Sequence, residues 1–177
     1  MKAVLVPLLA MLMLTTTLSG CLTDEQETVT FPEFSAVADD GQTYDNARMA
    51  ENGAYMVLFS AEWCNSPCYN TMHNIWQAQA NLPVLVMSTD PVENIGGVSL
   101  SDWHDSADAH DDEGNDTGVS LTSYAFMKGH EAGNALGIDT PGTLVFVNGD
   151  GEVTATHEGR IDSTQLILDY WNEAQGA

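Results

Sequence analysis

Apolar segments alternate along the chain with stretches whose apolar residues recur at helical spacing. Residues 54–60 and 82–88 are almost wholly apolar and predict two buried strands. Between them, the helical period predicts a helix over residues 67–80, and Pro67 suits its first turn, where no backbone N–H is needed. A strand, a helix and a strand of this size predict a right-handed crossover between parallel strands, and therefore an α/β fold.

Shorter elements are predicted on either side of this unit. Asp39-Asp40-Gly41-Gln42 is a turn signal and predicts a hairpin between two short segments. Residues 101–109 predict a short helix, and residues 131–136 predict another that ends at Gly137. Residues 120–127 fit either a strand or a helix, and we favour a short strand.

A second hairpin and a helix are predicted at the C-terminal end. Residues 143–147 and 152–157 predict antiparallel strands around a tight turn at 148–151. Ser163 is placed to cap the last helix. The inner side of that helix carries Leu166, Ile167, Tyr170, Trp171 and Ala174.

Residues 1–20 have the layout of a secretory signal peptide: a positive Lys2, an apolar stretch too short to span a bilayer comfortably, and small residues before Cys21. Leu18-Ser19-Gly20-Cys21 resembles the lipobox of lipoproteins, in which the cysteine is lipidated on sulfur and becomes the N-terminus. An ordinary signal cleaved nearby is the alternative, and we favour lipidation because such a coincidence of small residues and a cysteine is rare. Residues 21–30 then form an acidic tether without apolar periodicity.

The charge of the chain is extreme. Its 26 Asp and Glu residues face 4 Lys and Arg residues, for a net charge of −22, and removing Lys2 with the leader gives −22 − 1 = −23. Binding to nucleic acid is excluded, because almost nothing is left to neutralise phosphates. Anionic lipid would also repel the chain, so membrane residence would depend on the lipid anchor. Such a surface suits salty surroundings and basic partners.

The candidate chemistry lies in Trp63-Cys64-Asn65-Ser66-Pro67-Cys68. With Cys21 lipidated, Cys64 and Cys68 are the only pair among the three cysteines. Cys64 would lie where the strand ends and the helix begins, and the partial positive charge of a helix N-terminus stabilises a thiolate. Cysteines four residues apart are close enough for a disulfide. The pattern therefore indicates thiol–disulfide chemistry.

The motifs and the order of elements resemble the thioredoxin-like superfamily. Ala61-Glu62-Trp63-Cys64 resembles the approach to that family's active site, Pro67-Cys68 its end, and residues 136–143 the segment that carries its cis-proline. Phe31-Pro32-Glu33-Phe34, with the later Asp-Gly, resembles the extra N-terminal hairpin of the membrane-tethered TlpA/ResA-like branch. The resemblance implies a thioredoxin-like α/β domain over residues 31–177. Its central mixed sheet would have flanking helices and the extra hairpin, and residues 90–118 would be an acidic insertion.

The resemblance also implies an activity and its residues. Cys64 would be the attacking thiolate, and Cys68 would resolve the mixed disulfide and close the redox disulfide with Cys64. Trp63, Thr140 and a cis Pro141 would bind the substrate, with the backbone before the proline free to pair with an extended chain. The partners implied are protein thiols and disulfides and a redox-recharging protein, at the outer face of the cell membrane. No cofactor is implied.

Two departures from the family leave questions open. Three residues separate the cysteines, where the family usually has two. Leu58 occupies the position of a buried Asp of thioredoxins, so the proton acceptor for the Cys68 thiol is unassigned. Glu62 is the nearest carboxylate in sequence, but it fits a solvated surface residue equally well.

Other functions remain as alternatives. Cysteines at this spacing also bind copper in Sco-type chaperones, which share the fold and add a histidine ligand. Thr140 stands at the position expected for that histidine, which argues against copper, and His73 fits a surface or packing role better. A lipoprotein that only binds partners would use the disulfide as a staple, but closing so short a loop stabilises little. Redox chemistry explains the pair better.

The acidic stretch over residues 90–118 is best explained as a solvated loop pinned to the core by Trp103. It lacks the oxygen spacing of a calcium loop, so we expect no metal site there. Its candidate ligands are His104, Asp105, Asp108, His110, Asp111, Asp112 and Glu113.

Overall fold

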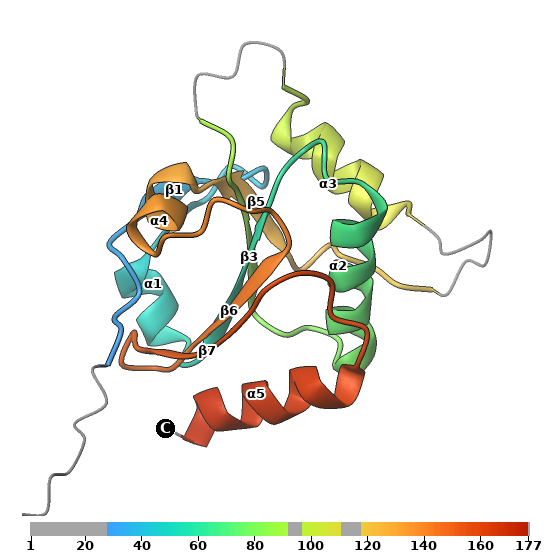
Figure 1. The fold of residues 1–177 in the computed structure, drawn as a ribbon. Helices are drawn as coiled ribbons and strands as arrows, with labels where there is room; N and C mark the ends of the chain where they lie inside the picture. The colour runs from blue at the N-terminus through green and yellow to red at the C-terminus, as the bar shows by residue number, and fades with distance from the viewer. Residues whose placement is uncertain (1–27, 92–96, 111–117, 177) are drawn as a thin grey trace, which may run out of the picture.

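The computed structural model describes residues 28–91, 97–110 and 118–176, and a five-stranded sheet lies at its centre (Figure 1). The strand order is β5-β4-β3-β6-β7. The three strands β3, β4 and β5 are parallel, while β6 is antiparallel to both β3 and β7. The strands are β3 (Tyr55–Ser60), β4 (Val84–Ser88), β5 (Ala125–Lys128), β6 (Thr143–Val147) and β7 (Val153–His157).

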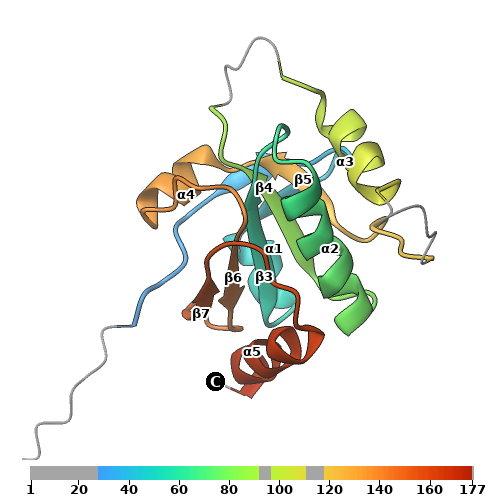
Figure 2. The ribbon, with the colours of Figure 1, turned by 45° about the vertical axis from the view of Figure 1, so that its right-hand side comes forward.

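Helices cover both faces of the sheet (Figure 2). On one face lie α2 (Ser66–Ala78), α3 (Leu100–Asp108) and α5 (Thr164–Gly176), and on the other α1 (Asn46–Glu51) and α4 (His130–Ala135). Every residue of β3, β4 and β6 is buried, because a central strand between two layers of helices has no solvated face. None of the helices in these described ranges is long and apolar enough to cross a membrane.

Strand alternation divides the core into two clusters. Leu58 of β3 packs toward α2 and α5, with Ile75 and Trp171, whereas the next residue, Phe59, packs toward α1 and α4. Trp103 of α3 is fully buried and contacts Phe126 of β5 edge to face. The expectation that Trp103 pins this part of the chain to the core is confirmed.

The N-terminal hairpin consists of β1 (Ser35–Val37) and β2 (Thr43–Asp45), and its turn closes the β5 edge of the sheet. The backbone N–H of Asp39 donates to the Phe126 carbonyl, and the Phe126 N–H donates to the Asp39 carboxylate at 2.8 Å. His104 of α3 bonds the same carboxylate at 2.6 Å. Because these bonds occupy the backbone of an edge strand, they remove a site for further strand pairing.

Most of the predicted elements are present, and their order is confirmed. The segment over residues 120–127 contains a turn and then β5, so the choice of a strand was right for its second half only. Helix α1 was not predicted from the sequence. That helix has six residues and one buried side chain, Met49, so it leaves no periodic pattern, although Asp45 caps it through the Arg48 N–H.

The assigned leader 1–20, the lipidation site Cys21 and residues 111–117 of the acidic stretch lie outside the described residues.

Candidate active site

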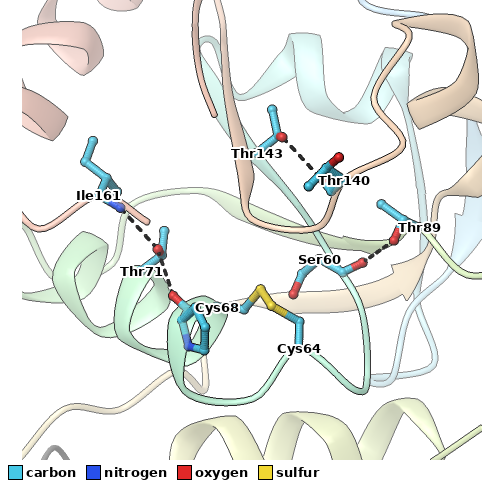
Figure 3. Close-up of a disulfide and its surroundings, with 9 residues drawn as sticks. Ser60, Cys64, Cys68, Thr71, Thr89, Thr140, Thr143 and Ile161 are labelled. Carbon is cyan, nitrogen blue, oxygen red and sulfur yellow. Dashed lines mark hydrogen bonds between the residues drawn. A yellow bond between two sulfur atoms is a disulfide. The ribbon is translucent and has the colours of Figure 1, made fainter. Parts of the chain in front are cut away.

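Cys64 and Cys68 form a disulfide between the end of β3 and the first turn of α2 (Figure 3). Their Cα atoms are 5.7 Å apart, so three intervening residues allow the bridge without opening the helix. Cys64 is half-buried, whereas Cys68 is 0% exposed. One sulfur therefore belongs to an accessible residue and the other to a buried one.

The loop before α2 presents Cys64 at the N-terminal end of the helix. The Cys64 N–H donates to the Ala61 carbonyl at 3.0 Å, which holds the loop tightly against the end of β3. Asn65, in the N-cap position, makes no side-chain capping bond, and Pro67 lies in the first turn. Because no side chain caps the end of α2, its positive dipole is free to act on the cysteine pair.

Glu62, two residues before Cys64, is buried at the ends of the parallel strands. Its side chain is 4% exposed and forms an ion pair with Lys128 of β5, whose side chain is 23% exposed. The Ser88 hydroxyl of β4 donates to its other carboxylate oxygen at 2.8 Å. The possibility that Glu62 is a solvated surface residue is wrong, because the carboxyl ends of parallel strands bring these partners together around it.

Hydrogen bonding governs the charge of Glu62. Burial alone would raise the pKa of its carboxyl, but hydrogen bonds from Asp90, Lys128, the backbone and Ser88 outweigh burial and lower the pKa. The pKa of Asp90 is raised, first by burial and then by its hydrogen bond with Glu62. The Trp63 indole N–H donates to Asp90 at 3.2 Å. This network thus contacts the side chain next to Cys64.

The Thr140–Pro141 loop lies beside the disulfide (Figure 3). The Gly142 N–H donates to the Phe59 carbonyl at 2.7 Å, and a Cβ added to Gly142 would lie 3.9 Å from the Cys68 Sγ. Gly142 has a φ of 99°, and the Thr143 hydroxyl donates to the Thr140 carbonyl at 3.2 Å. The loop therefore lies next to the cysteine pair.

The expected cis bond before Pro141 is wrong: no peptide bond is cis among the described residues. Pro141 followed by Gly142 at positive φ is the pattern typical of a type II turn, which has a trans proline at its second position. The positive φ of Gly142 therefore reverses the chain direction here, with Pro141 in the trans form.

A groove of about 500 Å³ continues from this loop along β7, the edge strand of the sheet. Thr140 and Gly159 lie at one part of its wall, and Thr154 and Thr156 of β7 lie at another. Asp139 and Glu158 also line it, and both are exposed. The remaining lining residues are Val29, Leu136, Gly137, Ile138, Thr143, Val153 and Ala155.

The described histidines are engaged in packing and hydrogen bonds. His73 is buried on α2 and bonds the Ala107 carbonyl at 2.8 Å, so of the two roles expected from the sequence, surface or packing, it has the packing role. His130 bonds the Thr89 carbonyl at 2.7 Å, and His110 bonds the Asn70 side chain at 3.0 Å. In the part of the chain that the structure describes, no three His, Cys, Asp or Glu side chains gather as metal ligands would.

Two features of the site escaped sequence reasoning. Lys128 lies 66 residues after Glu62, so only the β3-β4-β5 order brings the two together. Ser60 is fully buried beside the disulfide, and its hydroxyl has no hydrogen-bond partner. The one available signal was a polar residue at the end of an otherwise apolar strand.

The sheet order, the two helical layers and a disulfide at the start of α2 define a thioredoxin-like fold. No protein-family model matches the chain, and no curated protein matches it. Among solved structures, the fold is similar to the exposed lipoprotein thioredoxin of Streptococcus pneumoniae, with 20% identity and a TM-score of 0.57. That match covers 80% of this chain and 99% of the other.

Two further structures share the fold. The thio-disulfide isomerase of Thermus thermophilus is 17% identical with a TM-score of 0.62, over 83% of this chain and 95% of the other. A SCO1/SenC family lipoprotein of Bacillus anthracis is 10% identical with a TM-score of 0.56, over 85% of this chain and 99% of the other. At these identities the comparisons establish the fold alone.

Proposed function

We propose that the protein is an exported thiol–disulfide oxidoreductase that acts on protein substrates through Cys64 and Cys68. The observation that carries the proposal is a disulfide at a helix N-terminus with one half-buried and one buried cysteine. A structural staple needs no such asymmetry, whereas exchange chemistry requires one sulfur that a substrate can reach. Two of the similar structures are named as a thioredoxin and a thio-disulfide isomerase, which supports this class.

In the reducing direction, the Cys64 thiolate attacks one sulfur of a client disulfide and releases the other as a thiolate. The Cys68 thiolate then attacks the Cys64 sulfur of the mixed disulfide, which frees the second client thiolate and closes the Cys64–Cys68 disulfide. Two electrons pass to the client in total. A redox partner returns two electrons to the pair, and with an oxidising partner the same steps run in reverse.

The client would lie across Trp63 and the Thr140–Pro141 turn. Trp63 is 63% exposed, which is unusual for so large an apolar side chain and suits a contact surface. Thr140 is exposed at the end of the groove along β7, where an extended client chain has room beside the edge strand. Among the described residues, only the start of that edge is already occupied, because the Val153 N–H donates to the Val29 carbonyl at 2.7 Å.

We place the protein at the outer face of the cell membrane, held by lipid on Cys21 after removal of residues 1–20. Residues 21–30 would be the tether, residues 31–177 the thioredoxin-like domain, and residues 90–118 an acidic insertion within it. Two of the similar proteins are named as lipoproteins, which is compatible with this anchoring.

Trapping of mixed disulfides tests the activity. Cys68→Ser leaves the attacking thiol but removes the resolving one, so it should accumulate covalent complexes with client proteins that a reductant dissolves. Cys64→Ser is the matched control and should accumulate none. Equal trapping by both variants, or none by Cys68→Ser together with no reduction of insulin by the wild type, would contradict the proposal.

Copper transfer is the second candidate, because a SCO1/SenC family lipoprotein shares the fold. Two thiolates alone hold some Cu(I), so weak binding decides nothing. Tight Cu(I) binding with a histidine ligand visible by spectroscopy, together with no thiol exchange, would favour copper. A lipoprotein that only binds partners would instead keep its partner affinity when both cysteines are replaced by serine.

A further inference from the structure

We propose that the Ser60 hydroxyl is the buried hydrogen-bond donor to the Cys68 sulfur when the cysteine pair is reduced. On this reading, Ser60 lowers the pKa of the resolving thiol and stabilises the reduced form of the protein. The inference rests on the proposed oxidoreductase function and names the residue that tunes its second step.

The sheet places Ser60 next to Cys68. Strand alternation directs the side chains of Met56, Leu58 and then Ser60 to the face that α2 covers, and Cys68 belongs to α2. Across the strand pair, Phe59 is opposite Thr143, so Ser60 lies level with Gly142. A Cβ added to Gly142 would lie 3.9 Å from the Cys68 Sγ, so this level of the sheet is close to the Cys68 sulfur. Figure 3 shows the Ser60 hydroxyl pointing toward the disulfide.

The Ser60 hydroxyl is also unsatisfied. The residue is 0% exposed, and its Oγ has no hydrogen-bond partner, one of two such side-chain atoms among the described residues. Its carbonyl, by contrast, accepts from both the N–H and the hydroxyl of Thr89. A buried polar group without a partner is costly, and such groups in native structures generally have a function. A sulfur in a disulfide is a poor acceptor, whereas a thiolate is a strong one.

The other polar groups near Cys68 are already engaged. The Thr71 hydroxyl donates to the Pro67 carbonyl at 3.2 Å and accepts from the Ile161 N–H at 3.4 Å. Glu62 is held by Lys128 and Ser88. Asp90, half-buried after β4, accepts from Trp63, and His73, buried on α2, bonds the Ala107 carbonyl. Asp139 before the turn is exposed, as are Arg160 and Asp162, which pair with each other before α5. Ser60 is therefore the donor left for the Cys68 sulfur.

The role in exchange follows from the proposed steps. When the Cys68 thiol loses its proton to solvent, the Ser60 O–H donates to the thiolate. As that thiolate attacks the Cys64 sulfur, its charge passes to the departing client sulfur, and the Ser60 hydrogen bond is released. Ser60 exchanges no electrons and forms no bond to sulfur. A donor available only to the reduced pair stabilises that form, so it makes the disulfide more oxidising.

The first test isolates the thiol. In the full-length chain with Cys64→Ala, we would titrate Cys68 by the ultraviolet absorbance of its thiolate, which requires no reagent to reach the buried sulfur, with and without Ser60→Ala. A lost hydrogen bond to a charged group should raise the Cys68 pKa by about one or more, a roughly tenfold loss of thiolate below that pKa. Ser60→Thr keeps the hydroxyl and should restore the lower pKa.

The second test compares the two redox states. The equilibrium of the wild-type pair with glutathione should shift roughly tenfold toward the disulfide in Ser60→Ala. Urea unfolding of the oxidised form should be as difficult as for the wild type or more so, because the variant removes an unpartnered buried hydroxyl. Ser88→Ala, a buried hydroxyl at the same level of β4 that already has a partner, should destabilise both redox forms alike.

Unchanged Cys68 titration and an unchanged glutathione equilibrium in Ser60→Ala would overturn the inference. Insulin reduction by the wild type separates the two proposals. If the wild type reduces insulin while Ser60→Ala changes neither the Cys68 titration nor the glutathione equilibrium, only the role of Ser60 is refuted. If the wild type neither reduces a disulfide nor oxidises a dithiol, the oxidoreductase function fails, whatever the titration gives.

Discussion

Replacing Lys128 with Met should destabilise the fold by leaving the Glu62 carboxylate buried without its cation. The Glu62 side chain is 4% exposed, and among the described residues Lys128 is the one cation that pairs with it. Breaking a fully buried ion pair costs about 3–5 kcal/mol. Lys128 is partly solvated, and the Ser88 hydroxyl still donates to Glu62, so we expect a cost of about 2 kcal/mol. For a domain of this size that corresponds to roughly 4–8 °C in Tm.

The pH dependence identifies the cause. The pKa of Glu62 is lowered in the folded protein, so its contribution to stability is present above the ordinary glutamate pKa, 4.5, and is lost as pH falls through the folded pKa. In Lys128→Met that contribution is already missing. The difference between wild type and variant should therefore be largest at pH 6–7 and shrink below about pH 4.

The assay is urea unfolding of the oxidised full-length chain at several pH values, for the wild type, Lys128→Met, Glu62→Gln and the double variant. Glu62→Gln removes the buried charge, so adding Lys128→Met to it should cost little more, which gives a coupling energy of at least about 1 kcal/mol. A Lys128→Met cost that stays the same from pH 7 to pH 3.5, or that adds fully to Glu62→Gln, would refute the role of the ion pair.

Three further outcomes are expected. Cys21→Ser should release the protein from membranes, as measured by fractionation, while intact mass of the wild type should show a lipidated N-terminus at Cys21; a variant that stays membrane-bound contradicts the anchor. Gly129→Ala should destabilise the fold by about 1–3 kcal/mol in thermal unfolding, because its Cβ would lie 2.4 Å from the Met87 Cβ; an unchanged Tm contradicts this packing. Thr140→His should raise Cu(I) affinity in a competition titration and slow insulin reduction; unchanged copper affinity would show that this position does not face the sulfurs.

The sequence alone determined the elements whose signal is local. Continuous apolar runs identified β3, β4 and β6, because a strand covered on both faces can hold no polar residue along its middle. Helical spacing identified α2, and the spacing of Cys64 and Cys68 indicated the disulfide. These features depend on residues within one element, where period and spacing carry the information.

Tertiary structure decided which side chains meet. Lys128 reaches Glu62 only because β5 is two strands from β3, a proximity that no local pattern encodes. The same holds for Asp39, which bonds Phe126 across 87 positions of the chain. The bond before Pro141 was misjudged because a motif was given more weight than Gly142, whose positive φ makes the turn with a trans proline. The lack of a hydrogen-bond partner for the Ser60 hydroxyl is likewise visible only in the folded protein, because the packed layers exclude water from it.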